Sequence, residues 1–226
     1  MTALTLTATE LVYGWGRCKR CAWLSAHGKI SKPKPVYDFR VANALDKFAK
    51  RMITPELLRD AGHECVSASV PDRMSSAPIM FADLGVEVIC SGQPDLLTID
   101  THDMIGVIDV KSKDATPRAA EELSAQLHAY LYMIEHPSCG AAREVSSLGL
   151  LCWQLGRTPR FTSKGLNLAL IGELAYMEIA VDRGRFESLI HGIAEAFARE
   201  SAPDWGEDCE MCRAARASCA EYTTQR

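Results

Sequence analysis

The stretch GQPDLLTIDTHDMIGVIDVKSK, residues 92 to 113, decides how the rest of the chain is interpreted. It places Asp95 directly after a proline, and it places Asp109 and Lys111 inside a run of Ile and Val residues that is typical of a strand. A charged side chain within an apolar strand is costly unless it is paired or bound to a metal. The stretch therefore predicts a functional site on a β-sheet.

The expected geometry of this site follows from strand periodicity. Residues two apart in a strand point to the same face, so Asp109 and Lys111 share one face. If the strand starting at Asp95 pairs antiparallel with the next one, across a turn at 100–103, the two carboxylates approach each other. Such a pair favours a divalent cation, and its oxygen ligands suit Mg²⁺ or Mn²⁺. An isolated D-x-K triplet is also typical of a plain charge pair on an edge strand.

The order of the expected elements indicates a mixed sheet flanked by helices in one α/β domain. Helices are expected from apolar spacing and from capping residues, such as Thr116 before Pro117, at 7–15, 38–52, 55–61, 117–136 and 183–200. Strands rich in Val, Ile and Leu are expected at 86–90, 95–99, 105–111, 148–153 and 174–181.

Length, charge and composition restrict the class of protein. The chain has 226 residues, 47% of them hydrophobic, and a formal net charge of -4, which argues against an overall basic coat but allows a local basic channel. The N-terminus lacks the pattern of a signal peptide, and no apolar run reaches about 18 residues, so a cytoplasmic protein without a membrane span is expected.

The nine cysteines include two Cys-x-x-Cys pairs, Cys18 with Cys21 and Cys209 with Cys212. In a reducing compartment, clustered cysteines are more often metal ligands or redox groups than disulfides. Two such pairs have the usual spacing for four thiolates on one metal, and Cys219 is a fifth candidate. The remaining cysteines are single and are expected to pack in the interior: Cys65, Cys90, Cys139 and Cys152.

Three motifs occur in order: Pro94-Asp95, Asp109-Val110-Lys111 and, on the following helix, Gln126-x3-Tyr130. This set resembles the PD-(D/E)xK nuclease superfamily, and the helix motif resembles its RecB-like branch. The resemblance implies a restriction-endonuclease-like mixed central sheet flanked by helices, and metal-dependent cleavage of DNA phosphodiesters. It implies catalytic roles for Asp95, Asp109, Lys111, Gln126 and Tyr130, with Asp95, Asp109 and Val110 as ligands of the divalent ion.

The family usually has a further ligand on an upstream helix, and Asp46 is our candidate, with Glu64 and Glu87 as competitors. His128 lies inside the helix motif, where a lone histidine is more often structural than catalytic. The resemblance also extends to CRISPR-associated and AddB-type relatives, in which one N-terminal cysteine joins three C-terminal ones around a [4Fe–4S] cluster.

That comparison implies iron–sulfur ligands at Cys18, Cys209, Cys212 and Cys219, although the last spacing is one residue longer than the family pattern and Cys21 is extra. The alternative set replaces Cys219 by Cys21 and suits Zn²⁺. We prefer the iron–sulfur set. Either metal would join residues 15–25 to residues 205–220, beside a nuclease core at about 38–200, in a single domain spanning 1–226.

A basic stretch with aromatic neighbours is expected to contact DNA, through Lys19, Arg20, Trp23 and Lys29. A second basic patch lies at 157–164, and for each patch a merely solvated loop is an equally good interpretation. We therefore predict a nuclease, and specifically an exonuclease on single-stranded DNA or duplex ends, working with recombination, repair or CRISPR-adaptation proteins of a bacterium or phage. The alternative is a non-catalytic DNA-binding or adaptor subunit. A zinc-dependent regulatory protein would leave Asp95, Asp109 and Lys111 unexplained.

Overall fold

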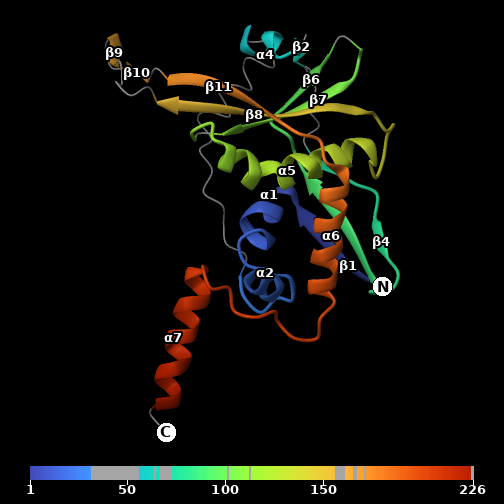
Figure 1. The fold of residues 1–226 in the computed structure, drawn as a ribbon, viewed down its shortest axis with the longest axis vertical. Coiled ribbons are helices and arrows are strands. Elements are labelled where there is room, and N and C mark those ends of the chain that lie inside the picture. Colours follow the sequence, from blue (N-terminus) through green and yellow to red (C-terminus); the bar gives the residue numbers. More distant parts are fainter. Residues whose placement is uncertain are drawn as a thin grey trace.

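The computed structural model describes residues 1–31, 56–63, 65–66, 73–100, 102–111, 113–155, 161–164, 167–170 and 172–224. The expected helix at 38–52, with Asp46, lies outside the described residues, as does Glu64. Side chains are not described in 65–66, 154–172 and 218–224. The molecule contains two mixed sheets with helices packed on and between them (Figure 1).

The five-stranded sheet carries the motif strands. Its order is β11 (Gly172–Ile179), β8 (Val145–Leu155), β7 (Ile105–Lys111), β6 (Leu96–Ile99) and β2 (Cys65–Val66). β7 is parallel to β8 and antiparallel to β6, and the other neighbours are antiparallel. The strands expected at 95–99, 105–111, 148–153 and 174–181 are thus confirmed to within a few residues at their ends. A separate hairpin joins β9 (Phe161–Lys164) to β10 (Asn167–Leu170).

The four-stranded sheet is centred on β5 (Val86–Gly92), which matches the strand expected at 86–90. β1 (Thr2–Thr7) pairs with it in parallel, and the short strands β3 (Met74–Ser75) and β4 (Ile79–Phe81) pair with it in antiparallel orientation. One central sheet was predicted from the sequence, and β1 was not predicted. The alternation of buried Leu4 and Leu6 with threonines is the period-2 signal that identifies this strand.

Helix α5 (Pro117–Glu135) is the central helix, because it contacts both sheets. Thr116 caps its first turn by accepting a hydrogen bond from the backbone N–H of Ala119. Its buried residues include Leu123, Leu127 and Leu131, which join the large core shared with β5, β7 and β8. The opposite face of the five-stranded sheet packs on α4 (Glu56–Asp60), through a smaller cluster around Leu58, Ile108 and Val110.

The N-terminal helices pack beneath α5 (Figure 1). They are α1 (Ala8–Glu10), the π-helical turn η1 (Leu11–Trp15) and α2 (Lys19–Ala26). A capping box between Thr7 and Glu10 starts the first of them directly after β1. Helix α6 (Arg183–Phe197) packs on α2, α5 and β5. Helix α7 (Glu210–Thr224), which the sequence analysis did not predict, extends away from the rest of the molecule (Figure 1).

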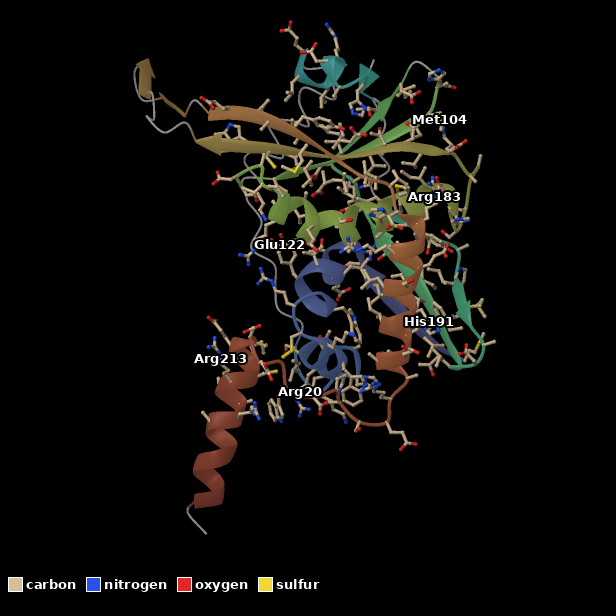
Figure 2. All side chains as sticks on the ribbon, viewed as in Figure 1. Arg20, Met104, Glu122, Arg183, His191 and Arg213 are labelled. Carbon is tan, nitrogen blue, oxygen red and sulfur yellow. The ribbon has the colours of Figure 1, made fainter. Side chains whose placement is uncertain are left out.

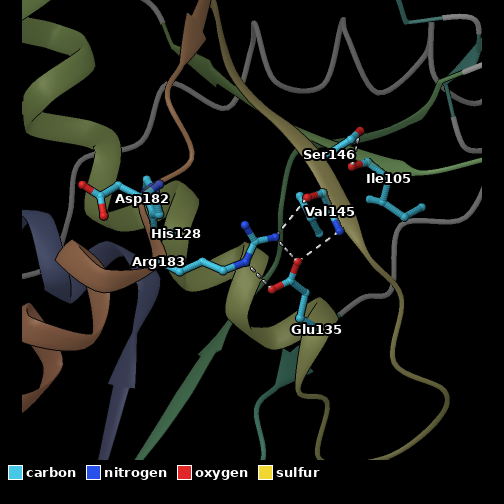
Figure 3. Close-up of polar contacts among 7 residues, drawn as sticks. All are labelled: Ile105, His128, Glu135, Val145, Ser146, Asp182 and Arg183. Atoms are coloured by element: carbon cyan, nitrogen blue, oxygen red, sulfur yellow. Dashed lines mark hydrogen bonds and ion pairs between the residues drawn. The ribbon is translucent and has the colours of Figure 1, made fainter. Parts of the chain in front are cut away.

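Two polar contacts join α6 to α5 (Figure 3). Arg183 donates from Nε and Nη2 to the two carboxylate oxygens of Glu135, at 2.9 and 2.5 Å, and Nη2 also reaches the carbonyl oxygen of Val145. The backbone N–H of Asp182 donates to His128 Nε2 at 2.8 Å, so His128 carries its proton on Nδ1 and donates it to the Ser124 carbonyl. His128 therefore has a structural position at the start of α6.

No helix in the described part of the chain is long and apolar enough to cross a membrane.

Candidate active site

The register of β6 and β7 brings two carboxylates to one point. Leu96 pairs with Ile108 in this antiparallel ladder, and continuing the register by one residue sets Asp95 opposite Asp109. The Asp95 carboxylate caps the end of the ladder by accepting the backbone N–H of Val110 at 2.7 Å. The pairing that the sequence predicted is present, because β6 and β7 are joined by a short turn whose Asp100 side chain accepts the N–H groups of His102 and Met104.

Asp109 lies at the centre of the site and is only 1% exposed. It forms an ion pair with Lys111, whose side chain is 20% exposed. Burial raises the pKa of Asp109 to about 7; the Lys111 ammonium opposes the rise and the Asp95 carboxylate adds to it. Burial acts to lower the pKa of Lys111, but the charge of Asp109 outweighs it and the net shift is upward, so Lys111 is cationic.

Helix α5 places Gln126 and Tyr130 over this pair, since residues four apart share a helix face. Gln126 Nε2 donates to Asp109 Oδ1 at 3.3 Å and to the Tyr130 hydroxyl oxygen at 2.9 Å. Gln126 and Tyr130 are 4% and 3% exposed, so the motif lies within the core rather than on the surface. All five residues expected to be catalytic are thus gathered at one place.

Two oxygens of this cluster fit a bound cation. Asp109 Oδ2 is buried and is contacted by the Lys111 ammonium, and Gln126 Oε1 is buried without a hydrogen-bond partner among the described residues. A buried oxygen without a donor is costly, and a cation between Asp95 and Asp109 would relieve the repulsion of the two carboxylates. The donor set is therefore compatible with Mg²⁺ or Mn²⁺. Glu87 is half-buried on β5 in the other sheet and lies outside this cluster.

Tyr13, which was not singled out from the sequence, lies close to Lys111 of this cluster, and Arg17 lies against Tyr13. Tyr13 is 39% exposed, and it is close enough to Lys111 for its phenol group to contribute to the raised pKa of that lysine. The Arg17 guanidinium lies 5.0 Å from the centre of the Tyr13 ring. The signal that could have identified Tyr13 is an exposed aromatic side chain in a short helix in which Val12 and Trp15 are buried.

The residues expected to bind DNA have different positions. Lys19 and Lys29 are exposed. Arg20 instead stacks on Trp205, 3.9 Å from the ring centre, and donates to the carbonyl oxygen of Pro203, near the start of α7 (Figure 2). Trp23 is buried and stacks on His27, so its ring cannot reach a base without leaving the core.

A second cluster, built from cysteines, lies between α2 and the start of α7. The sulfur atoms of Cys18, Cys21, Cys209 and Cys212 all lie within 4.8 Å of one another. None of these four cysteines forms a disulfide. These four cysteines are the alternative ligand set, which contains Cys21 instead of Cys219. Cys219 belongs to α7, and its side chain is outside the described part.

The chain matches the PD-(D/E)XK nuclease superfamily over residues 30–220. This match covers most of the chain, and the two mixed sheets flanked by helices agree with a restriction-endonuclease-like fold. The protein belongs to the PD-(D/E)XK nuclease superfamily. No protein in the curated collection matches it.

Among solved structures, the chain is similar to one titled "Crystal structure of SSO0001", with 13% sequence identity and a TM-score of 0.49. The alignment covers 88% of this chain and 78% of that one.

Proposed function

We propose that this protein is a divalent-metal-dependent deoxyribonuclease whose catalytic cluster is Asp95, Asp109, Lys111, Gln126 and Tyr130. The observation that carries the proposal is Asp109. It is a fully buried carboxylate that faces a second carboxylate, and its two oxygens contact the Lys111 ammonium and the Gln126 amide. A stable fold alone would not require so costly an arrangement.

Each residue then has a role that its position supports. Asp95, Asp109 and the carbonyl of Val110 would hold Mg²⁺ or Mn²⁺, with Asp46 as the candidate upstream ligand. The ion would polarise the scissile phosphate and lower the pKa of a nearby water. Lys111, cationic and partly exposed, would hold or neutralise the phosphate. Gln126, oriented by the Tyr130 hydroxyl, would keep the Asp109 carboxylate in position.

Single-stranded DNA or the end of a duplex is the proposed substrate. Tyr13 offers an exposed ring beside the cluster for an unpaired base, and Arg17, Lys19 and Lys29 offer charges for phosphates. Exonuclease action in recombination, repair or CRISPR adaptation, in the cytoplasm of a bacterium or of a phage-infected cell, fits such a substrate.

A non-catalytic DNA-binding or adaptor subunit is the competing function. It is favoured by the depth of Asp109, because a carboxylate that is 1% exposed must become accessible to a hydrated ion. The two functions differ in one result, which is cleavage by the wild-type protein.

The deciding experiment incubates wild-type protein with end-labelled single-stranded and duplex DNA and with circular single-stranded DNA, in Mg²⁺, Mn²⁺ or no divalent ion. We expect metal-dependent shortening of the linear substrates and survival of the circle, since an exonuclease needs an end. Asp109→Asn and Lys111→Ala should each reduce the rate by roughly 10²-fold or more. Asp83→Asn, at an exposed turn, is the matched control and should cut normally.

Two results would overturn the proposal. If wild-type protein binds DNA but cuts none of these substrates with any ion, the adaptor function is correct. If Asp109→Asn and Lys111→Ala fold and cut as fast as wild type, the catalytic cluster lies elsewhere.

A further inference from the structure

The C-terminal segment of the described chain is attached to the molecule with almost no apolar packing. From Asp204 to Ala217, Cys212 is the one residue whose side chain is buried. Arg20 stacks on Trp205, at the start of this segment, and donates to the carbonyl oxygen of Pro203, just before it. Helix α7 nevertheless begins at a defined place, against α2. Hydrophobic burial cannot account for this attachment, so another link is needed.

The four cysteines supply that link through two turns of the same construction. Cys18 precedes α2, and its carbonyl accepts the N–H of Ala22 at 3.0 Å. Cys209 precedes α7, and its carbonyl accepts the N–H of Arg213 at 2.9 Å. Each Cys-x-x-Cys pair thus spans the first turn of a helix, where backbone N–H groups and the helix dipole favour negatively charged sulfur.

The space between the two turns is closely fitted to the sulfur atoms. A side chain at Gly206 would bring its Cβ to 3.0 Å from Cys18 Sγ and 3.2 Å from the Cβ of Cys209, a tight approach that favours glycine. Three sulfur–sulfur separations are 3.5 Å (Cys18 to Cys212), 3.7 Å (Cys21 to Cys209) and 3.7 Å (Cys21 to Cys212).

These distances discriminate between one ion and a cluster. A zinc–sulfur bond is about 2.3 Å, so the edge of a ZnS₄ tetrahedron is about 3.8 Å. A [4Fe–4S] cube inserts a different iron at each thiolate, which holds the four sulfurs further apart than on one ion. The largest separation of 4.8 Å leaves no room for the cube. Helix geometry agrees, because Cys212 and Cys219 are seven residues apart in α7, about 10 Å along its axis.

We propose that Cys18, Cys21, Cys209 and Cys212 bind one tetrahedral Zn²⁺ ion, and that Cys219 is not a ligand. The site is closed, with four protein ligands and no open position, so its role is structural. It joins α2 to α7, and thereby the two ends of a chain segment of nearly 200 residues. This proposal does not depend on nuclease activity.

The test measures metal directly. Protein purified without added metal is assayed for zinc, iron and acid-labile sulfide, as wild type and as Cys21→Ser, Cys219→Ser and Cys139→Ser. We expect about one zinc per chain and no sulfide in wild type. Cys139 was expected to pack in the interior but is exposed, which makes it a suitable control. Cys219→Ser and Cys139→Ser should keep the zinc, and Cys21→Ser should lose it. Cys21→His should restore it, since Cys₃His sites bind zinc.

Two further measurements keep the proposal testable if Cys21→Ser does not fold. Exchange of Co²⁺ into wild-type protein should give the absorption of a tetrahedral cobalt tetrathiolate. Asp109→Asn should retain full zinc, which separates this site from the catalytic one. The proposal fails if wild type contains iron and sulfide that are lost in Cys219→Ser, or if wild type holds no metal.

Discussion

At the scale of single residues, Asp109 is the side chain whose position is most costly for folding. Its carboxylate is buried among apolar neighbours, next to a second carboxylate, and the resulting rise in pKa reflects the cost of its charge. The sequence pointed to this residue because an aspartate within an apolar strand needs a reason. No comparable pattern in the sequence indicated that Arg20 and Trp23 pack within the molecule. A basic or aromatic residue near a terminus suits both DNA contact and internal packing.

Asp109→Asn is therefore expected to abolish cleavage without lowering stability. Asparagine keeps the shape of the side chain and can still contact Gln126, but it removes a charge that is costly to bury. Thermal unfolding should show a melting temperature equal to or above that of wild type. A marked drop in the melting temperature would mean that Asp109 serves the fold, and the assignment of the residue to catalysis would lose its main physical argument.

Tyr13 carries a second prediction at this scale. If its exposed ring stacks on an unpaired base, Tyr13→Ala should weaken single-stranded DNA binding by about 1–3 kcal/mol, and Tyr13→Phe should bind normally. Fluorescence anisotropy with a catalytically inactive background, such as Asp109→Asn, measures this without cleavage. Met80→Ala, which removes an exposed side chain on β4, is the control. Equal affinities for Tyr13→Ala and wild type would remove Tyr13 from the DNA path.

At the scale of elements, α5 organises the molecule because it is covered by both sheets and carries catalytic and structural polar groups on different faces. Gln126 reaches Asp109 on β7, whereas His128 and Glu135 contact the start of α6 (Figure 3). The bounds of α5 were predictable from its capping threonine, its proline and its apolar spacing. The side to which the His128 ring points was not predictable, because its hydrogen-bond partner, the backbone N–H of Asp182, is 54 residues away.

The joint between α5 and α6 should make stability sensitive to acid. Burial lowers the pKa of His128; the Ser124 carbonyl and Asp182 oppose this shift, and Arg183 and Arg185 add to it. Burial likewise lowers the pKa of His63, which lies between Thr98 and Tyr176. The unfolded chain then binds more protons at these two histidines, so their contribution to the free energy of unfolding should be highest above about pH 6.5 and fall as the pH drops below it. The raised pKa of Asp109 contributes with the opposite sign as the pH rises toward 7, so the share of His128 is measured as the difference between wild type and a His128 variant.

Urea unfolding between about pH 7.5 and 5 measures this slope. His128→Gln should reduce the slope but not abolish it, because glutamine can accept the Asp182 N–H without titrating and His63 remains. His191→Gln, on the exposed side of α6, is the matched control and should leave the slope unchanged (Figure 2). A slope that is the same in His128→Gln and wild type would show that His128 does not contribute.

At the scale of the whole molecule, the cysteine cluster joins α2 to the start of α7. The segment that carries α7 has almost no hydrophobic packing of its own against the rest of the molecule. Because metal binding is coupled to folding, removal of the ion should release α7 while the two sheets remain folded. Treatment with a strong zinc chelator should make the exposed Arg213 and Arg216 readily cleaved by trypsin, and zinc should restore protection. Hydrogen exchange should rise in 205–217 and stay low in β7 and α5. If α7 is equally protected with and without metal, the cluster is not its attachment.

The sequence by itself determined that Asp95, Asp109, Lys111, Gln126 and Tyr130 come together, because the geometry of this proposed catalytic cluster depends on short-range rules. A four-residue turn sets the β6–β7 register, strand alternation puts Asp109 and Lys111 on one face, and helix periodicity aligns Gln126 with Tyr130. Only the tertiary structure decided which cysteines meet. Cys18 and Cys212 are separated by 194 residues, and no local rule states whether Cys21 or Cys219 completes the set. The same holds for the second sheet, for Arg20 on Trp205 and for Tyr13 beside Lys111, since contacts between distant segments depend on how whole elements pack.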